Sequence, residues 1–270
     1  MSSNPCLLDQ LLQPSGISTV FQPIVERHRG VRLHALECLS RGPRGTSLEP
    51  PDVLFDYVRL KNAEILVDRA CIVGAFRSAC DLAWIPRLSI NVHASTLCAD
   101  PGFPSFLAQS AEDHSISLEQ VIVEIIEHSP ASDLEALRRA LEELRQLGAH
   151  IALDDVGLGY SSYQMLLECR PDYYKIDRYL VQGCHVDPDR RALLDSIVFL
   201  ADRLGARVVA EGIEDGEELM AVTKLGIDLV QGHFFSRALS AADLDDHRLF
   251  VDPSPRAREP DVLVPMAASA

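Results

Sequence analysis

Short apolar runs recur along most of this chain and are separated by longer amphipathic stretches. The short runs are rich in valine, isoleucine, leucine and tyrosine, and several are almost continuously apolar, which is typical of strands covered on both faces of a sheet. Eight such runs are predicted to be strands: Thr19–Val25, Arg32–Glu37, Leu88–Val92, Val121–Ile125, His150–Leu153, Tyr173–Ile176, Arg207–Ala210 and Ile227–Val230. They predict a sheet whose strands alternate with helices.

The stretches between the strands carry helix-end signals. Ser132 and Glu135 have the spacing of an N-terminal capping box, and Gly148 supplies a stop. Asp187-Pro188 is typical of a helix start and Gly205 of a helix end. Eight strands alternating with helices predict an α/β fold of the (β/α)8 barrel type, which typically needs about 250 residues. An open doubly wound sheet is the alternative.

The chain has 270 residues, enough for one large domain or two small ones. The strand–helix alternation extends over residues 15–250, which we expect to form a single barrel. Residues 1–14 are expected to be a leader or a capping helix. Residues 251–270 show little periodicity and end in small side chains, so we expect a flexible C-terminal tail.

Charge and cysteine content narrow the choice of partners and compartment. The chain has 40 acidic and 25 basic residues, a formal charge of −15, so its surface repels nucleic-acid polymers and anionic membranes. A small anionic ligand stays possible, because divalent cations can reverse the local sign. Seven cysteines without a C-x-x-C pair favour a reduced compartment. No signal-peptide pattern or membrane-span run is visible, so we expect a cytoplasmic location.

Polar residues stand at the ends of the predicted strands. Parallel strands of a barrel deliver such residues to one rim, the face that carries chemistry. Several acids gathered there need compensating positive charge, and carboxylate and amide oxygens suit Mg²⁺ or Mn²⁺. The residues are Glu37, Asn91, Glu124, Asp154, Asp155, Lys175, Glu211 and Gln231.

Each of these residues also has an ordinary explanation. Asn91 alone is typical of a turn, and Asp154-Asp155 before a glycine is equally typical of a turn with a helix cap. Glu37 could be a solvated or paired acid, and Lys175 a surface lysine. The joint pattern is much harder to explain without a metal site. The nine histidines show no ligand spacing, and we interpret them as structural or surface residues.

An ordered series of motifs runs from about Val20 to Leu239 and resembles the EAL-domain family, bacterial phosphodiesterases of cyclic di-GMP. The signature is matched by Glu37-Cys38-Leu39, with Arg41 four residues after the glutamate. The other matching motifs are Phe21-Gln22-Pro23-Ile24, Ser89-Ile90-Asn91-Val92, Glu124-Ile125-Ile126-Glu127, Asp154-Asp155-Val156-Gly157-Leu158-Gly159-Tyr160-Ser161-Ser162, Lys175-Ile176-Asp177, Glu211-Gly212-Ile213-Glu214 and Gln231-Gly232-His233-Phe234-Phe235-Ser236.

The resemblance implies a modified TIM (β/α)8 barrel whose first strand runs antiparallel to the rest. It implies hydrolysis of cyclic di-GMP to linear pGpG with two Mg²⁺ or Mn²⁺ ions per site. The first metal would be held by Glu37, Asn91, Glu124 and Asp154, and the second by Asp154 and Asp155. A metal pair of this kind activates water and neutralises phosphate oxygens.

The resemblance also implies roles for residues around the metals. Lys175 would orient the attacking water and Glu211 would be the general base. Glu127 would anchor the Asp155–Ser162 loop, through which the family forms a homodimer. Substrate would be bound by Gln22, Leu39, Arg41, Glu214 and Gln231.

The chain departs from the family at several positions. Cys38 replaces the alanine of the signature, and a small apolar thiol fits there. Val156 and Leu158 replace Phe and Thr in the loop, His93 stands where serine is typical, and residues 42–66 match poorly, so the substrate lip is expected to differ. A catalytically silent cyclic di-GMP receptor or interaction module is therefore one alternative. A metal-dependent barrel enzyme of another class is a weaker one.

Overall fold

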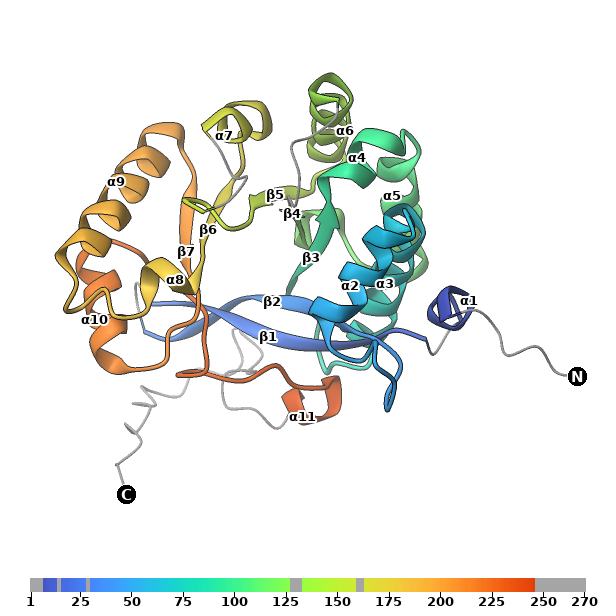
Figure 1. Cartoon of the computed structure of the whole chain (residues 1–270), viewed down its shortest axis with the longest axis horizontal. Coiled ribbons are helices and arrows are strands. Elements are labelled where there is room, and N and C mark those ends of the chain that lie inside the picture. Colours follow the sequence, from blue (N-terminus) through green and yellow to red (C-terminus); the bar gives the residue numbers. More distant parts are fainter. Residues whose placement is uncertain (1–6, 14–15, 28–29, 127–132, 159–162, 246–270) are drawn as a thin grey trace, which may run out of the picture.

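The computed structural model describes residues 7–13, 16–27, 30–126, 133–158 and 163–245. Its strands pair in chain order into a closed barrel, as Figure 1 shows. The first strand pairs antiparallel with both of its neighbours, and the other pairings are parallel. The bounds are β1 Ser18–Glu26, β2 Arg32–Arg41, β3 Arg87–His93, β4 Val121–Ile126, β5 His150–Leu153, β6 Tyr173–Ile176, β7 Arg207–Ala210 and β8 Leu229–Val230. The predicted barrel with a reversed first strand is confirmed, and the open sheet is wrong.

The strand bounds agree with the sequence pattern except at β2 and β8. Glu37 was expected to end its strand, but β2 continues to Arg41 because the antiparallel β1 pairs with it as far as Ser18. Glu37 therefore lies inside its strand, where it pairs with Ser89 of the parallel neighbour β3. At β8 the predicted four residues are reduced to Leu229–Val230.

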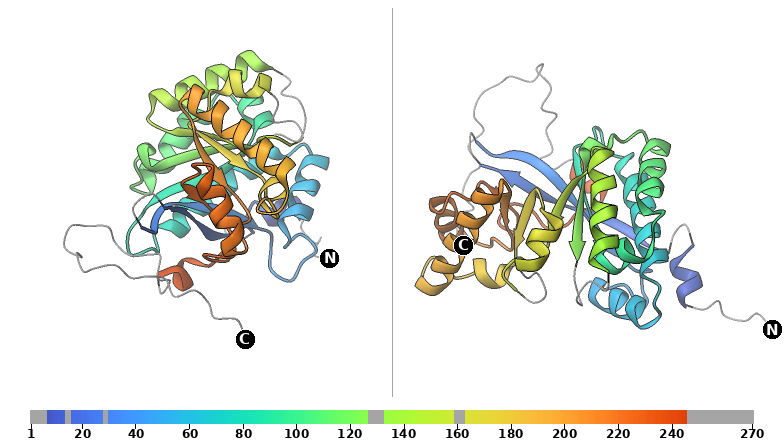
Figure 2. Two further views of the ribbon diagram at one scale, coloured as in Figure 1. Left: turned by 90° about the vertical axis from the view of Figure 1, so that its left-hand side faces the viewer. Right: turned by 90° about the horizontal axis from the view of Figure 1, so that it is seen from above.

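Helices lie around the barrel, above and beside the strands in Figure 1, while α11 lies beneath β1. Figure 2 shows α3, α5 and α6 together on one side of the barrel and α9 and α10 on the other. The described helices are α1 Leu7–Leu11, α2 Pro51–Leu60, α3 Glu64–Ala79, α4 Ala94–Ala99, α5 Phe103–Asp113, α6 Leu134–Gln146, α7 Tyr163–Cys169, α8 Arg178–Val181, α9 Pro188–Leu204, α10 Gly216–Lys224 and α11 Ala241–Asp245. None of the helices in these ranges is long and apolar enough to cross a bilayer.

Helix ends follow the sequence signals in one case and shift in another. The Asp187 carboxylate caps α9 by accepting from two backbone N–H groups, and Gly205 closes that helix in the left-handed conformation. The cap of α6 was expected at Ser132, but it is Asp133, which accepts from the N–H groups of Glu135 and Ala136. Aspartate is an equally good cap, and it stands one residue nearer the apolar stripe.

The barrel interior is layered, and this layering places the site. One apolar layer consists of Ile24, Ala35, Ile122, Ala152, Tyr173, Val209 and Leu229. Because side chains alternate along a strand, the next inward-facing position is two residues away. On every strand of this layer that position is polar: Gln22, Glu37, Glu124, Asp154, Lys175, Glu211 and Gln231. The polar ring therefore rests on an apolar floor, at the end where parallel-barrel enzymes carry their chemistry.

Candidate active site

Lys175 is the centre of the polar ring. Its side chain is 3% exposed, and its Nζ lies 2.6 Å from Glu211 Oε1 and 2.7 Å from Glu124 Oε2. Two further carboxylate oxygens, on Glu37 and Asp154, lie 3.5 Å from the same nitrogen. Four carboxyl groups, on or directly after four other strands, thus converge on one ammonium group. The site has more negative charge than its own lysine can balance.

The pKa values of these groups reflect that imbalance. Burial alone would lower the pKa of Lys175, but the four carboxylates outweigh it and raise that pKa well above its usual value. Burial raises the pKa of Glu124 to about 8 despite the lysine charge, and the pKa of Glu211 also rises well above its ordinary range. For Glu37 the burial effect is overcome by Lys175 and by hydrogen bonds from two amides, so its pKa is lowered.

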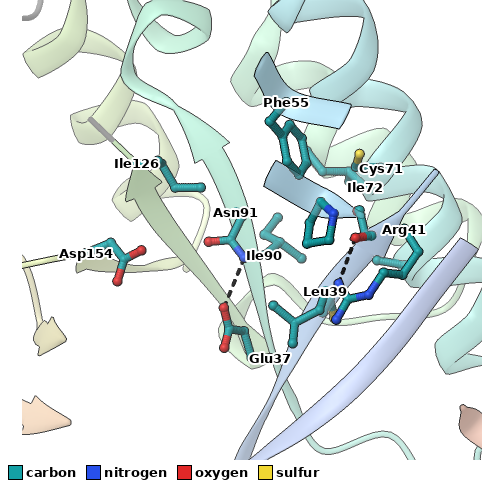
Figure 3. Close-up of a pocket in the computed structure, with 14 residues that line it drawn as sticks. Glu37, Leu39, Arg41, Phe55, Cys71, Ile72, Ile90, Asn91, Ile126 and Asp154 are labelled. Carbon is teal, nitrogen blue, oxygen red and sulfur yellow. Dashed lines mark hydrogen bonds between the residues drawn. The ribbon is translucent and has the colours of Figure 1, made fainter. Parts of the chain in front are cut away.

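Amide side chains hold Glu37 from two sides. Asn91 Nδ2 donates to Glu37 Oε1 at 3.1 Å, and Gln231 Nε2 donates to Glu37 Oε2 at 2.7 Å. Gln231 Nε2 also lies within hydrogen-bond distance of Gln22 Oε1, at 3.3 Å. These bonds fix the carboxylate plane of Glu37 across three strands. They also determine the direction of the Asn91 amide, whose oxygen is turned away from Glu37 in Figure 3.

Sequence reasoning missed Ser89 as a site residue. Its hydroxyl donates to Glu124 Oε1, and its side chain is buried in the same interior layer. The sequence contained a feature that could have identified it: Ser89 stands two residues before Asn91 on the same strand, so both side chains lie on the same face. The Ser89 bond leaves Glu124 with one oxygen held by a hydroxyl and the other by Lys175.

Asp155 adopts a left-handed backbone conformation, with φ of 52°. Aspartate tolerates the left-handed conformation better than most residues do. The turn at this position changes the direction of the chain after β5. Partial desolvation, with the charges of Asp154 and Asp177, raises the pKa of the Asp155 carboxyl to about 6, although the residue as a whole is exposed. The next residue donates its N–H to the Lys175 carbonyl at 2.9 Å, which ties the turn to β6.

Two cavities flank the carboxylates and share Glu37 and Asp154. One, of about 280 Å³, is walled largely by apolar side chains, and Figure 3 shows Leu39, Phe55 and Ile72 there, across from Asn91 and Asp154. The other, of about 370 Å³, is polar and lined by Gln22, Lys175, Arg178, Glu211, Glu214, Gln231 and His233, among others. Arg41 stands at the edge of the apolar cavity and donates to its neighbour's carbonyl, Ser40 O, at 2.9 Å.

Most of the expected site residues therefore meet in one place. Leu39 and Arg41 lie along the apolar cavity, and Gln22 and Glu214 along the polar one. Three lining residues were not predicted as site residues from the sequence. They are Arg178 and His233 in the polar cavity and Phe55 in the apolar cavity. Glu127 and residues 159–162 of the expected dimer loop lie outside the described residues, so the predictions for them are untested.

The donor set suits hard divalent cations. Glu37, Glu124 and Asp154 supply carboxylate oxygens and Asn91 an amide oxygen, which are the ligands that Mg²⁺ and Mn²⁺ prefer. In the described part of the chain, Gln231 Oε1 is buried without a hydrogen-bond partner, so at least one acceptor is not satisfied by protein. Burial, together with the neighbouring carboxylates, raises the pKa values of Glu124 and Glu211, and bound cations would offset both effects by favouring the charged forms.

Comparison with known proteins shows which family the chain belongs to. The sequence model of the EAL domain matches residues 7–238. The chain is 36% identical over 157 residues to the cyclic di-GMP phosphodiesterase RocR of Pseudomonas aeruginosa, covering 57% of this chain and 39% of RocR. It is 30% identical over 151 residues to the blue light- and temperature-regulated antirepressor BluF of Escherichia coli K12, covering 56% of this chain and 38% of BluF. The chain thus spans about two fifths of the length of these relatives.

A solved structure shares the fold. The complex of BlrP1 from Klebsiella pneumoniae with calcium and cyclic di-GMP matches 89% of this chain and 59% of the BlrP1 chain, with a TM-score of 0.75 and 30% identity. That protein therefore has a barrel of the same kind, which was solved with a divalent cation and a cyclic dinucleotide.

Proposed function

Because this chain belongs to the EAL domain family, we propose that it is a divalent-metal-dependent phosphodiesterase that hydrolyses cyclic di-GMP to linear pGpG. The observation that carries the proposal is the convergence of four carboxylates on the buried Lys175, beside the Asn91 amide. This arrangement combines metal-ligand chemistry with one internal cation. Relatives named as cyclic di-GMP phosphodiesterases, RocR among them, support the choice of substrate.

Two Mg²⁺ or Mn²⁺ ions would be held by Glu37, Asn91, Glu124, Asp154 and Asp155. When bound, such ions lower the pKa of water and neutralise phosphate oxygens. Asp154 is well placed to contribute to both, because its carboxylate faces both cavities. Asp155 follows it directly on a turn, so its side chain leaves the barrel interior in a different direction. Ser89 would orient Glu124 by its hydroxyl bond.

Glu211 is the general base in this proposal. Its side chain lines the polar cavity beside the metal-ligand carboxylates, where it can accept a proton from water. Lys175 holds Glu211 at 2.6 Å and thereby fixes the direction of the accepting oxygens. Water loses its proton to Glu211 and forms a new bond to phosphorus. The bond from phosphorus to the ribose 3′ oxygen breaks, and a proton returns to that oxygen, leaving the 5′ phosphate of pGpG.

The two cavities would receive the substrate on either side of the carboxylates. The apolar cavity, with Leu39 in its wall, suits the face of a nucleobase, and Arg41 at its edge suits a phosphate. Gln22, Glu214 and Gln231 line the polar cavity and offer hydrogen-bonding groups for ribose or the second base. Glu127 would anchor the Asp155–Ser162 loop.

We also propose a homodimer formed around the Asp155–Ser162 loop. The elements that flank this loop expose large apolar side chains. Tyr163 and Leu167 of α7 are 79% and 64% exposed, and Phe199 of α9 is 68% exposed. Tyr163 and Leu167 lie one turn apart on the same helix, and exposed apolar side chains of this kind favour association with another protein surface.

The direct test is incubation of the chain with cyclic di-GMP and Mg²⁺ or Mn²⁺, with pGpG followed by chromatography. We expect pGpG to accumulate with either metal and not in excess chelator. Absence of pGpG with both metals, while cyclic di-GMP still binds, would reject the hydrolase. That result would support the receptor alternative. Two observations motivate this alternative: Val156 and Leu158 in the loop, and a relative that is named as an antirepressor, BluF.

A further inference from the structure

We propose that His93 is a positioning residue for substrate, which acts by supporting Phe55 in the wall of the apolar cavity while Asp68 holds the imidazole in place. The inference rests on the proposed function, since it assigns this cavity to the bound nucleotide. It concerns three side chains from separate elements, β3, α2 and α3. None of them belongs to the carboxylate ring.

Asp68 is an acid of α3 that is buried at the junction between β3 and α4. Its side chain is 2% exposed, and its Oδ2 accepts the His93 backbone N–H at 3.0 Å and the Thr96 hydroxyl at 2.6 Å. Its Oδ1 lies 2.8 Å from His93 Nδ1. Among the described residues, no lysine or arginine forms an ion pair with this carboxylate. The buried charge is thus stabilised by the residues of this one junction.

These bonds determine the tautomer and orientation of the His93 ring. An ionised carboxylate can only accept, so His93 Nδ1 carries the hydrogen that it donates to Asp68. The histidine side chain is 6% exposed, and its backbone and ring are both bonded to the same carboxyl group. Because the backbone and the ring of His93 are both bonded to one buried carboxyl group, the ring cannot rotate freely. It therefore presents a fixed surface to whatever packs against it.

Phe55 of α2 packs against that surface. The ring centroids of Phe55 and His93 are 5.6 Å apart with planes at 57°, a favourable tilted contact between aromatic rings. Phe55 also lines the apolar cavity, on the wall that faces Asn91 and Asp154 in Figure 3. Support from His93 on one side would hold the Phe55 ring against a ligand on the other. The pair should therefore affect substrate affinity more than the chemical step.

His93→Asn separates the two roles of the imidazole. An asparagine Nδ2 occupies nearly the position of histidine Nδ1, so the bond to Asp68 can be kept while the contact with Phe55 is lost. We expect KM for cyclic di-GMP to rise about three- to tenfold, the scale of a lost aromatic pair, with kcat within about twofold. His93→Ala, which loses both contacts, should also lower kcat and thermal stability.

His114→Asn is the matched control. His114 also bonds through Nδ1, at 2.7 Å from Ser110 O, and also packs near a phenylalanine, Phe76, but neither ring lines either cavity. We expect it to leave KM and kcat unchanged. A double-mutant cycle adds a second test: in a Phe55→Ala background, His93→Asn should raise KM no further.

The outcomes separate this inference from the proposed function. Kd for cyclic di-GMP, measured by calorimetry with Ca²⁺, gives a readout that does not require turnover. Normal binding by the unaltered chain with an unchanged Kd and KM in His93→Asn would overturn the positioning role. So would equal losses in kcat/KM and stability for His93→Asn and His93→Ala, or full additivity with Phe55→Ala. No binding and no turnover by the unaltered chain would instead overturn the proposed function.

Discussion

Lys175 Nζ lies 2.6 Å from Glu211 Oε1, across two adjacent parallel strands of the barrel. Neither strand alone would place the two groups together, since the register pairs Lys175 with Val209 and Glu211 stands two residues further on. The lysine therefore reaches the carboxylate diagonally, within the polar layer. This contact connects the charge balance of the site with its proposed base.

Replacing Glu211 by glutamine tests the proposed base. The amide keeps the volume of the side chain but cannot accept a proton from water, so we expect kcat to fall at least about a hundredfold, with KM within a few fold. The rate of pGpG formation measures the effect. Glu217→Gln is the matched control, because this glutamate of α10 is 72% exposed and should be replaceable without loss. A Glu211→Gln rate within tenfold of the unaltered chain would reject the assignment.

Removing the charge of Lys175 should destabilise the fold. Lys175→Met leaves four carboxyl groups in contact without their cation, and loss of one partner of a buried pair typically costs about 3–5 kcal/mol. We expect this loss in the free energy of unfolding by urea at pH 7 in chelator. Added Mn²⁺ should recover more stability in the variant than in the unaltered chain.

The control for this change is Lys224→Met, which removes the same charge from an exposed position in the last turn of α10. It should change the free energy of unfolding by less than about 0.5 kcal/mol. Equal losses in the two variants would show that the carboxylate ring does not depend on its lysine for stability.

His34, at the opposite end of the barrel from the carboxylates, should make the free energy of unfolding depend on pH. Burial, with the charges of Arg207 and Arg87, lowers the pKa of His34 to about 4, whereas an unfolded histidine titrates near 6.5. Below pH 6.5 the unfolded state binds the extra proton first, so stability falls as pH decreases from about 6.5 to 4. The full loss is on the order of 3 kcal/mol. Urea unfolding at pH 7.5, 5.5 and 4.5 should show it.

His34→Gln should flatten that pH dependence. The glutamine amide can keep a hydrogen bond with the Tyr173 hydroxyl, which lies 3.3 Å from His34 Nε2, but it does not titrate. His114→Gln keeps His34 and should retain most of the fall. The interpretation would be wrong if His34→Gln lost as much stability between pH 7.5 and 4.5 as the unaltered chain.

The proposed dimer can be tested by charge placed on the exposed apolar residues. Leu167→Glu and Phe199→Glu should shift the chain from dimer to monomer in sedimentation velocity experiments, since a buried unpaired carboxylate opposes association. Leu60→Glu is the control, because Leu60 is 81% exposed on the distant α2. A monomeric unaltered chain at all concentrations, or dissociation by Leu60→Glu alone, would contradict the proposed interface.

The sequence by itself determined the strands and most of the polar ring. Apolar runs and the polar residues at their ends are local features, so Asp154, Lys175 and Glu211 could be singled out before the barrel was known. Helix ends such as Asp187 and Gly205 were equally local, because a cap depends on neighbours along the chain.

Only the tertiary structure decided which groups meet across the barrel. The extension of β2 beyond Glu37 depends on pairing with β1, and the Ser89–Glu124 bond depends on the register of β3 and β4. The contact of His93 with Phe55 joins β3 to α2, which no sequence spacing relates. Periodicity indicates which face of a strand a residue occupies. Closure of the barrel and packing of the helices determine what that face touches.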